Sequence, residues 1–174
     1  LAKLNGEKKI ELSSRAHGAV ASLWKTAIDN SIIDILKKHL PLQKRDGLSV
    51  AHSLLIAAIH RVIEPASKNA FSDWAKKTTL PDLAGFEYER ITSRHFWDQM
   101  DTVTDEQIKN IQNDLTSMII NKLDFTPETL FFDSTNFFTF IDTQNQHCEI
   151  APRGHNKQKR NDLRQFGLAM LVSK

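Results

Sequence analysis

A single carboxylate interrupts a strongly apolar stretch of the sequence. Residues 131–140 read FFDSTNFFTF, in which Asp133 stands among five phenylalanines. Because an unpaired buried charge is costly, a carboxylate in such surroundings normally has a partner. A divalent metal ion is one such partner, and backbone amides at the end of a strand are the alternative. We therefore take Asp133 as a candidate metal ligand and keep the capping role open.

A basic segment follows this stretch. Residues 153–164 read RGHNKQKRNDLR and contain one acid, Asp162. The five cations of the segment are Arg153, Lys157, Lys159, Arg160 and Arg164. The formal charge of the whole chain is only +2, so this is a local concentration of positive charge. It suits contacts to the phosphates of a nucleic acid, which hold the ligand without reading its sequence, and a solvated turn is the alternative. His155 is either a further phosphate contact or an ordinary surface residue.

A third group of candidates lies earlier in the chain. Residues 92–101 predict a short helix whose first turn carries Arg94 and His95. Short helices joined by tight turns are compatible with a helix-turn-helix, in which such residues contact DNA. A solvated first turn is the alternative for both side chains.

The elements that would position these residues fall into two regions. Apolar periodicity predicts helices within residues 1–125, over 19–28, 32–40, 50–63, 67–77 and 92–101. Residues 104–107 (TDEQ) have the form of a capping box and begin a further helix, which extends to about residue 123. We assign Trp24, Trp74 and Trp97 to the core of the helical region, with stacking platforms as the alternative, and we assign His52 and His60 to structural roles.

Residues 126–174 are extended in character. The stretch 129–141 is rich in β-forming residues and apolar on both alternating faces, which predicts a central strand covered on both sides. Further strands are predicted over 147–151 and 166–172, and the three most simply form a meander. The predicted class is α+β.

Composition limits the classes that remain. The 174 residues are 40% hydrophobic and 25% charged, which is ordinary for one or two small domains. Cys148 is the only cysteine, which excludes an internal disulfide and a cysteine-rich zinc site and fits a reducing compartment. No apolar run is long enough to span a bilayer, so we expect a cytoplasmic protein without membrane contact. The sequence starts at Leu1 and stops at Lys174, directly after a predicted strand, so we expect part of a longer protein.

Several stretches together resemble one family. Asp133-Ser-Thr on a strand, followed by GHNKQKRNDLRQFGL at 154–168, resembles the start of the catalytic domain of DDE transposases from bacterial insertion sequences, in the insertion-sequence-four-like group. Three upstream stretches are similar to the helical region that precedes that domain: HRVIEPASK at 60–68, WAKKTTL at 74–80 and TSRHFWDQM at 92–100. The resemblance runs over nearly the whole chain from about Gly18.

The resemblance implies a fold and an activity. Residues 1–125 would be a helical region that binds the ends of the element, and 126–174 the incomplete beginning of an RNase H-like catalytic domain. Asp133 would be the first catalytic acid, which with an aspartate and a glutamate from later elements holds two Mg²⁺ or Mn²⁺ ions. Such a pair of ions supports cleavage and strand transfer by in-line attack on phosphate. The implied partners are double-stranded DNA, at the element ends and the target, and a second copy of the chain on DNA.

The sequence departs from the family pattern in one respect. Neither Asp142 nor Asp162 lies where the family places its second acid, and the third acid is also missing. We therefore expect this chain alone to be catalytically silent, because one carboxylate cannot fix two ions. Two alternatives stay open: a truncated transposase product that binds DNA without cutting it, and a helical protein-interaction module in which Asp133 caps a strand.

Overall fold

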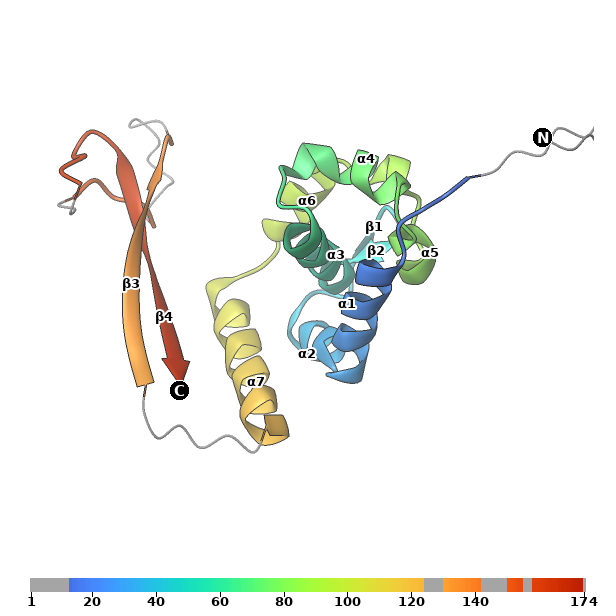
Figure 1. Ribbon diagram of the computed structural model, residues 1–174, viewed down its shortest axis with the longest axis horizontal. Helices are drawn as coiled ribbons and strands as arrows, with labels where there is room; N and C mark the ends of the chain where they lie inside the picture. The colour runs from blue at the N-terminus through green and yellow to red at the C-terminus, as the bar shows by residue number, and fades with distance from the viewer. Residues whose placement is uncertain (1–12, 124–129, 142–149, 155–157, 174) are drawn as a thin grey trace, which may run out of the picture. The chain divides into compact units, whose positions relative to one another are not determined.

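Two units make up the chain, and each is described by itself. The structure is a computed structural model, and it describes residues 13–123, 130–141, 150–154 and 158–173. The first unit is Leu1–Leu123, which is helical, and the second is Asp124–Lys174, which contains a pair of long strands (Figure 1). The protein therefore belongs to the mixed α+β class.

Helices account for most of the first unit. They are α1 (Gly18–Asp29), α2 (Ile32–His39), α3 (Val50–Ile63), α4 (Phe71–Lys76), α5 (Leu80–Ala84), α6 (Ser93–Met100) and α7 (Asp105–Leu123), with short 3₁₀ turns η1 (Lys68–Ala70) and η2 (Tyr88–Arg90). The periodicity predicted most of these helices to within a residue at each end, and the predicted helix 67–77 is divided into η1 and α4. No helix of the described residues is long and apolar enough to cross a membrane.

Local chemistry explains where the helices start and stop. The predicted capping box is present at α7, where the Gln107 amide donates to Thr104 Oγ1 at 3.3 Å and the Thr104 amide donates to Gln107 Oε1 at 2.9 Å. Ser49 caps α3 by accepting a bond from the His52 amide. Gly85 ends α5 with a φ of +72°, a conformation that glycine adopts without strain.

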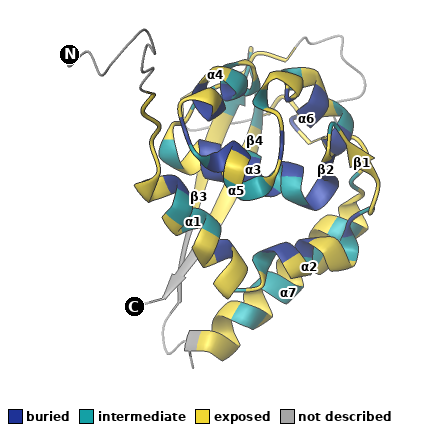
Figure 2. Ribbon diagram, turned by 90° about the vertical axis from the view of Figure 1, so that its right-hand side faces the viewer, coloured by how far each residue is buried: buried dark blue, intermediate teal, exposed yellow. Residues whose placement is uncertain are grey.

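The core of the first unit forms around α3. This helix packs against α1, α2, α4 and α6, and Figure 2 shows the buried residues concentrated around it. Among its buried side chains, Ile56 and Ile59 each contribute roughly 1.5–3 kcal/mol by leaving water. Trp74 lies in the core and Trp24 packs against it, as predicted. The same prediction is wrong for Trp97, which is 55% exposed because α6 buries the neighbouring stripe of His95, Phe96 and Gln99.

A hairpin precedes α3 and was not predicted. Strands β1 (Lys44–Arg45) and β2 (Leu48–Ser49) are antiparallel and are joined by Asp46 and Gly47. Both turn residues have positive φ, 50° at Asp46 and 87° at Gly47, as an Asp-Gly hairpin turn requires. The turn fixes the Asp46 side chain beside α6, where it meets His95.

His95 connects the hairpin, α3 and α6 inside the core. Its Nδ1 lies 2.8 Å from Asp46 Oδ2, and its Nε2 lies 2.9 Å from Ser53 Oγ. The ionised Asp46 carboxylate can only accept, so Nδ1 is the donor to it. The Ser53 hydroxyl lies between Nε2 and the Ser49 carbonyl, to which it donates at 3.0 Å. The prediction that His95 contacts DNA is wrong, because the residue is 1% exposed and both ring nitrogens have partners.

The second unit contains an antiparallel ribbon. Strand β3 (Leu130–Thr139) pairs with β4 (Arg164–Ser173) in a register that runs from Leu130 opposite Ser173 to Thr139 opposite Arg164. The first and third predicted strands are therefore present as direct neighbours, which corrects the predicted meander order. Of the predicted strand 147–151, residues 147–149 lie outside the described part, and residues 150 and 151 are bends.

The expected burial of β3 on both sides is not observed in the described residues. Phe137 and Phe166 lie opposite each other in the ribbon and stack with their ring centroids 5.5 Å apart, yet both stay exposed, as does Leu168. The strands therefore carry the apolar residues on which the prediction depended. Among the described residues, however, these side chains are not covered as they would be in the centre of a sheet.

Replacing His95 by alanine should lower the free energy of unfolding by about 2–4 kcal/mol, because the change opens a cavity and leaves Ser53 and Asp46 without a partner. Urea denaturation followed by tryptophan fluorescence measures it. Arg94→Ala is the matched control, since Arg94 is the preceding residue and 79% exposed, and we expect its free energy of unfolding to fall by less than roughly 0.5 kcal/mol. Equal stability of the two variants would contradict the role assigned to His95.

The bond to His95 also predicts a pH dependence. That bond, against the opposing effect of burial, holds the pKa of Asp46 below its ordinary value. A folded pKa below the unfolded one stabilises the fold above the ordinary carboxyl range of about 4, and the contribution disappears as the pH falls through the folded pKa. Asp46→Asn should therefore flatten the loss of stability as the pH falls below about 4, whereas Asp73→Asn, which changes an exposed carboxylate of α4, should not. Urea midpoints over a pH series measure both.

Candidate nucleic-acid interface

Asp133 lies inside the ribbon. Its backbone belongs to β3 and pairs with Met170 in β4. The capping alternative requires a position at the end of a strand, and the pairing continues past Asp133 to Leu130 on one side and to Thr139 on the other. A role at the end of a strand therefore does not fit the position of Asp133.

The described residues do not form a complete metal site. Among them, no group of three histidine, cysteine, aspartate or glutamate side chains lies close enough to hold a metal ion. One carboxylate on β3 does not fit a two-ion centre, so no catalytic step through a metal follows from this structure.

The basic segment leads directly into β4. Arg164 starts the strand and donates from Nη1 to the Ala151 carbonyl at 3.2 Å, while the Gln165 amide donates to the Pro152 carbonyl at 3.1 Å. An isolated bridge pairs Arg153 with Arg164. These bonds bring residues 151–153 alongside the first residues of the strand, so two of the predicted phosphate contacts lie together. Two further candidates, His155 and Lys157, lie outside the described residues.

An ion pair changes the electrostatics of this segment. Arg160 binds Asp162 through two parallel bonds, from Nε to Oδ1 at 2.9 Å and from Nη2 to Oδ2 at 2.8 Å. The bond from Arg160 is the main reason that the pKa of Asp162 falls to about 2, so the acid stays charged at any physiological pH. The charge of Arg160 is therefore largely compensated, and the segment presents Arg153 and Lys159 as exposed cations.

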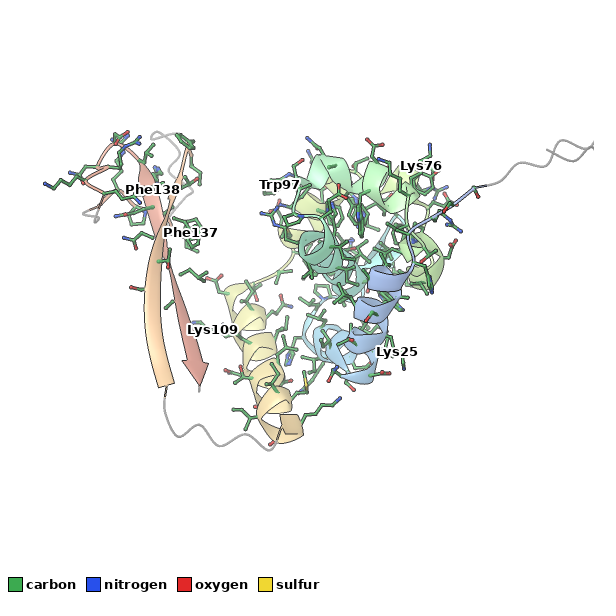
Figure 3. The ribbon with its side chains drawn as sticks, viewed as in Figure 1. Lys25, Lys76, Trp97, Lys109, Phe137 and Phe138 are labelled. Atoms are coloured by element: carbon green, nitrogen blue, oxygen red, sulfur yellow. The ribbon has the colours of Figure 1, made fainter. Side chains whose placement is uncertain are left out.

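Exposed aromatic rings lie at the same end of the ribbon. Thr139 pairs with Arg164 there, Figure 3 shows Phe137 and Phe138 close by, and Phe140 is exposed beyond them. Cations beside exposed aromatic rings are the combination that binds single-stranded nucleic acids, through phosphate contacts and base stacking. Sequence reasoning assigned these phenylalanines to a covered sheet and did not consider them as contacts.

The helical unit offers a weaker candidate. Arg94 is exposed, but its Nε lies 2.7 Å from Asp98 Oδ1, and Arg45 binds the other oxygen of the same carboxylate. Arg45 also lies 3.4 Å from Asp46, so two arginines face two acids at this surface. Arg94 is therefore an ion-paired residue, and not the unpaired one that the sequence suggested.

Asp46, His95 and Ser53 have the order of a catalytic triad. The distances of 2.8 and 2.9 Å match that arrangement, which sequence reasoning did not predict. Ser53, however, is 0% exposed and donates its proton to the Ser49 carbonyl. Because no substrate reaches the hydroxyl and its proton is already donated, we assign the three residues to the core.

Comparison with known proteins gives no family for the chain. No family model, no curated protein and no solved structure matches it. The functional assignment consequently depends on the residues and geometry described above.

Replacing Asp162 by asparagine should tighten the binding of duplex DNA, because the change removes the negative charge that compensates Arg160. The slope of log K against log salt should become steeper by about 0.9, the value for one more neutralised phosphate. Fluorescence anisotropy with a labelled duplex over a KCl series measures the slope. Asp34→Asn makes the same charge change at an exposed position of α2, and an equal effect of both variants would exclude a local role of the segment.

Proposed function

We propose that this chain is the amino-terminal part of a DDE-type transposase, with a helical region that binds element ends and the first strands of an RNase H-like catalytic domain. The observation that carries the proposal is the direct pairing of β3 with β4. It makes the strand that carries Asp133 and the strand that follows the basic segment neighbours. The pairing supports the proposal because it brings the strand of the acid and the strand after the basic segment into one sheet, although it differs from the meander order that the sequence predicted.

Within this proposal the residues of the ribbon divide two tasks. Asp133 would be one ligand of a divalent site, Mg²⁺ or Mn²⁺, together with two acids that the described residues do not include. The ions of such a site would activate the attacking oxygen and stabilise the leaving one. Arg153 and Lys159 would hold the DNA backbone. Asp162 would limit the contribution of Arg160 to phosphate binding, because the two side chains form an ion pair. Phosphate contacts of this type position DNA and carry no sequence information.

A second candidate function is a DNA-binding product that does not cut. The observation behind it is that no group of three or more potential metal-ligating side chains forms among the described residues. The two candidates share the DNA contact and differ in catalysis alone, so the contact is the property to test first.

The test replaces Lys157, Lys159 and Arg160 by alanine together. We expect weaker binding of every duplex sequence alike, and a salt slope reduced by about 0.9 for each phosphate that the variant no longer neutralises. Because Asp162 compensates Arg160, a reduction that corresponds to about two phosphates rather than three is expected. The measurement is the same anisotropy titration over a KCl series.

A matched triple variant controls for net charge. It replaces Lys25, Lys76 and Lys109, three lysines on the helical unit that Figure 3 labels, and we expect a smaller change of slope. An unchanged slope in the variant of the basic segment would remove that segment from the proposal. Magnesium-dependent nicking by the unmodified chain, abolished in Asp133→Asn, would show that one acid is sufficient after all and reject the non-cutting candidate.

A further inference from the structure

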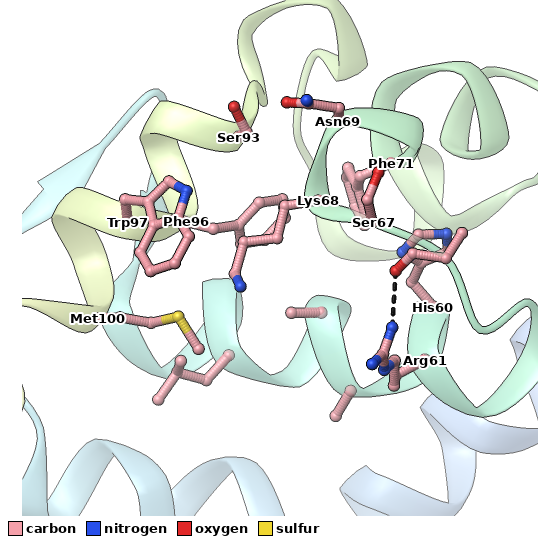
Figure 4. Close-up of a pocket in the computed structure, with 14 residues that line it drawn as sticks. His60, Arg61, Ser67, Lys68, Asn69, Phe71, Ser93, Phe96, Trp97 and Met100 are labelled. Carbon is pink, nitrogen blue, oxygen red and sulfur yellow. Dashed lines mark hydrogen bonds between the residues drawn. The ribbon is translucent and has the colours of Figure 1, made fainter. Parts of the chain in front are cut away.

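The helical unit contains a cavity of about 670 Å³ between α3, η1 and α6 (Figure 4). Small alanine side chains of α3, at 57 and 58, leave room above the helix, while Phe71 and Phe96 form apolar walls. Trp97, at the side of α6, is the large exposed aromatic of this cavity. The volume of the cavity lies within the usual range of small-ligand sites, about 300–1,000 Å³.

The charged groups of the cavity all have the same sign. Lys68 extends from η1 across the cavity, and its Nζ lies 4.4 Å from the centre of the Trp97 ring. Arg61 lies on the opposite side, where its Nη1 donates to the Ala66 carbonyl at 2.8 Å. None of the described residues that line the cavity has a carboxylate. The cavity therefore favours a ligand with a negative group.

One polar atom of the lining is buried without a partner. His60 is 4% exposed and packs between the rings of Phe71 and Trp74, at centroid distances of 5.4 and 4.6 Å. Its Nε2 has no hydrogen-bond partner among the described residues. Burial lowers the pKa of this imidazole, which favours the neutral ring. A buried polar atom without a partner is costly, and a ligand that provides a partner would remove the cost.

We propose that this cavity binds an unpaired nucleotide, with the base stacked on Trp97, the phosphate at Lys68 and Arg61, and the polar edge of the base towards His60. Trp97 and His60 lie on opposite sides of the cavity, so a flat ring entering beside Trp97 extends towards the imidazole (Figure 4). A fatty acid would satisfy the apolar walls and the cations but would leave Nε2 unpaired. A nucleotide provides a contact for the apolar walls, for the cations and for His60 Nε2. Aromatic rings beside cations are also the usual platform for unpaired bases.

The interaction already present shows how the ligand would enter. Lys68 covers the face of Trp97 as a cation over an aromatic ring. A base takes that place on the ring, and the ammonium moves to the phosphate that arrives with it. The nucleotide has two sources, a free mononucleotide or an unpaired nucleotide of a DNA strand, and the second source rests on the proposed function.

The first experiment observes Trp97 directly in the whole chain. Labelling with 5-fluorotryptophan gives one ¹⁹F resonance for each of the three tryptophans, and Trp97→Phe identifies the one of interest. Deoxyadenosine monophosphate should shift the Trp97 resonance with saturation and leave that of Trp24 in place. Deoxyadenosine and deoxyribose 5-phosphate, each lacking one of the two recognised groups, should bind at least about tenfold more weakly.

Two lysine variants test whether the mononucleotide binds in this cavity. Lys68→Ala should weaken the binding of the mononucleotide by about fivefold to tenfold, the effect of removing one cation that pairs with phosphate. Lys76→Ala removes the same charge from an exposed position of α4 outside the cavity, and should leave the affinity unchanged. No shift of Trp97 at millimolar nucleotide, or an equal weakening in the two variants, overturns the proposal.

Experiments with duplex DNA distinguish a free mononucleotide from an unpaired nucleotide of a DNA strand as the ligand. A duplex with a single-stranded overhang should bind more tightly than a blunt one, and Lys68→Ala should abolish the difference if the nucleotide belongs to a DNA strand. Binding of the mononucleotide with no difference between the duplexes assigns the cavity to a free nucleotide. Because the mononucleotide experiment does not depend on the basic segment, it succeeds or fails independently of the proposed function.

Discussion

The bonds that His95 makes to Asp46 and Ser53 hold the helical unit in its present arrangement. They join a hairpin turn, the central helix α3 and helix α6, three segments that are distant in the sequence. The bond to Ser53 is buried and the bond to Asp46 is partly buried, and a rotation of α6 would break both. The position of α6 in turn fixes Phe96 and Trp97 opposite α3. The cavity therefore exists because a polar network, and not apolar packing alone, determines where α6 lies.

Opposite charges are paired in both units, and this limits what the basic surface can do. Asp98 binds Arg45 and Arg94, Asp162 binds Arg160, and Asp114 accepts bonds from Lys38 and His39. Counting cations along the sequence overstates the positive field, because several are compensated within a few ångströms. In the described part of the chain, the cations left for a polyanion are the lysines and arginines outside these pairs. Binding of DNA by such a surface would depend strongly on ionic strength.

The sequence predicted what local rules determine. Apolar spacing located the main helices, and the reciprocal bonds of Thr104 and Gln107 confirmed the capping box. The Asp-Gly turn at residues 46 and 47 is a readable hairpin signal that the predictions did not use. The burial of His95 and the exposure of Trp97 were predicted wrongly. One side of α6 faces Asp46 and Ser53 and the other faces the cavity, and only tertiary packing decides which side is buried. The unpartnered nitrogen of His60 had no signal in the sequence for the same reason.

Helix α7 fixes where the chain leaves the helical unit. Asp114 attaches the middle of the helix to α2, and Lys122 reaches the Asp29 carbonyl at the end of α1. At 1.5 Å per residue, the 19 residues of α7 carry the chain about 28 Å from the side of α6 to the side of α1. Each residue also turns the helix by about 100°, so the direction in which the chain leaves α7 depends on the number of residues in the helix. Inserting one residue after Asp114 would swing the departing chain by more than a quarter of a circle, whereas inserting a whole turn would only shift it along the axis.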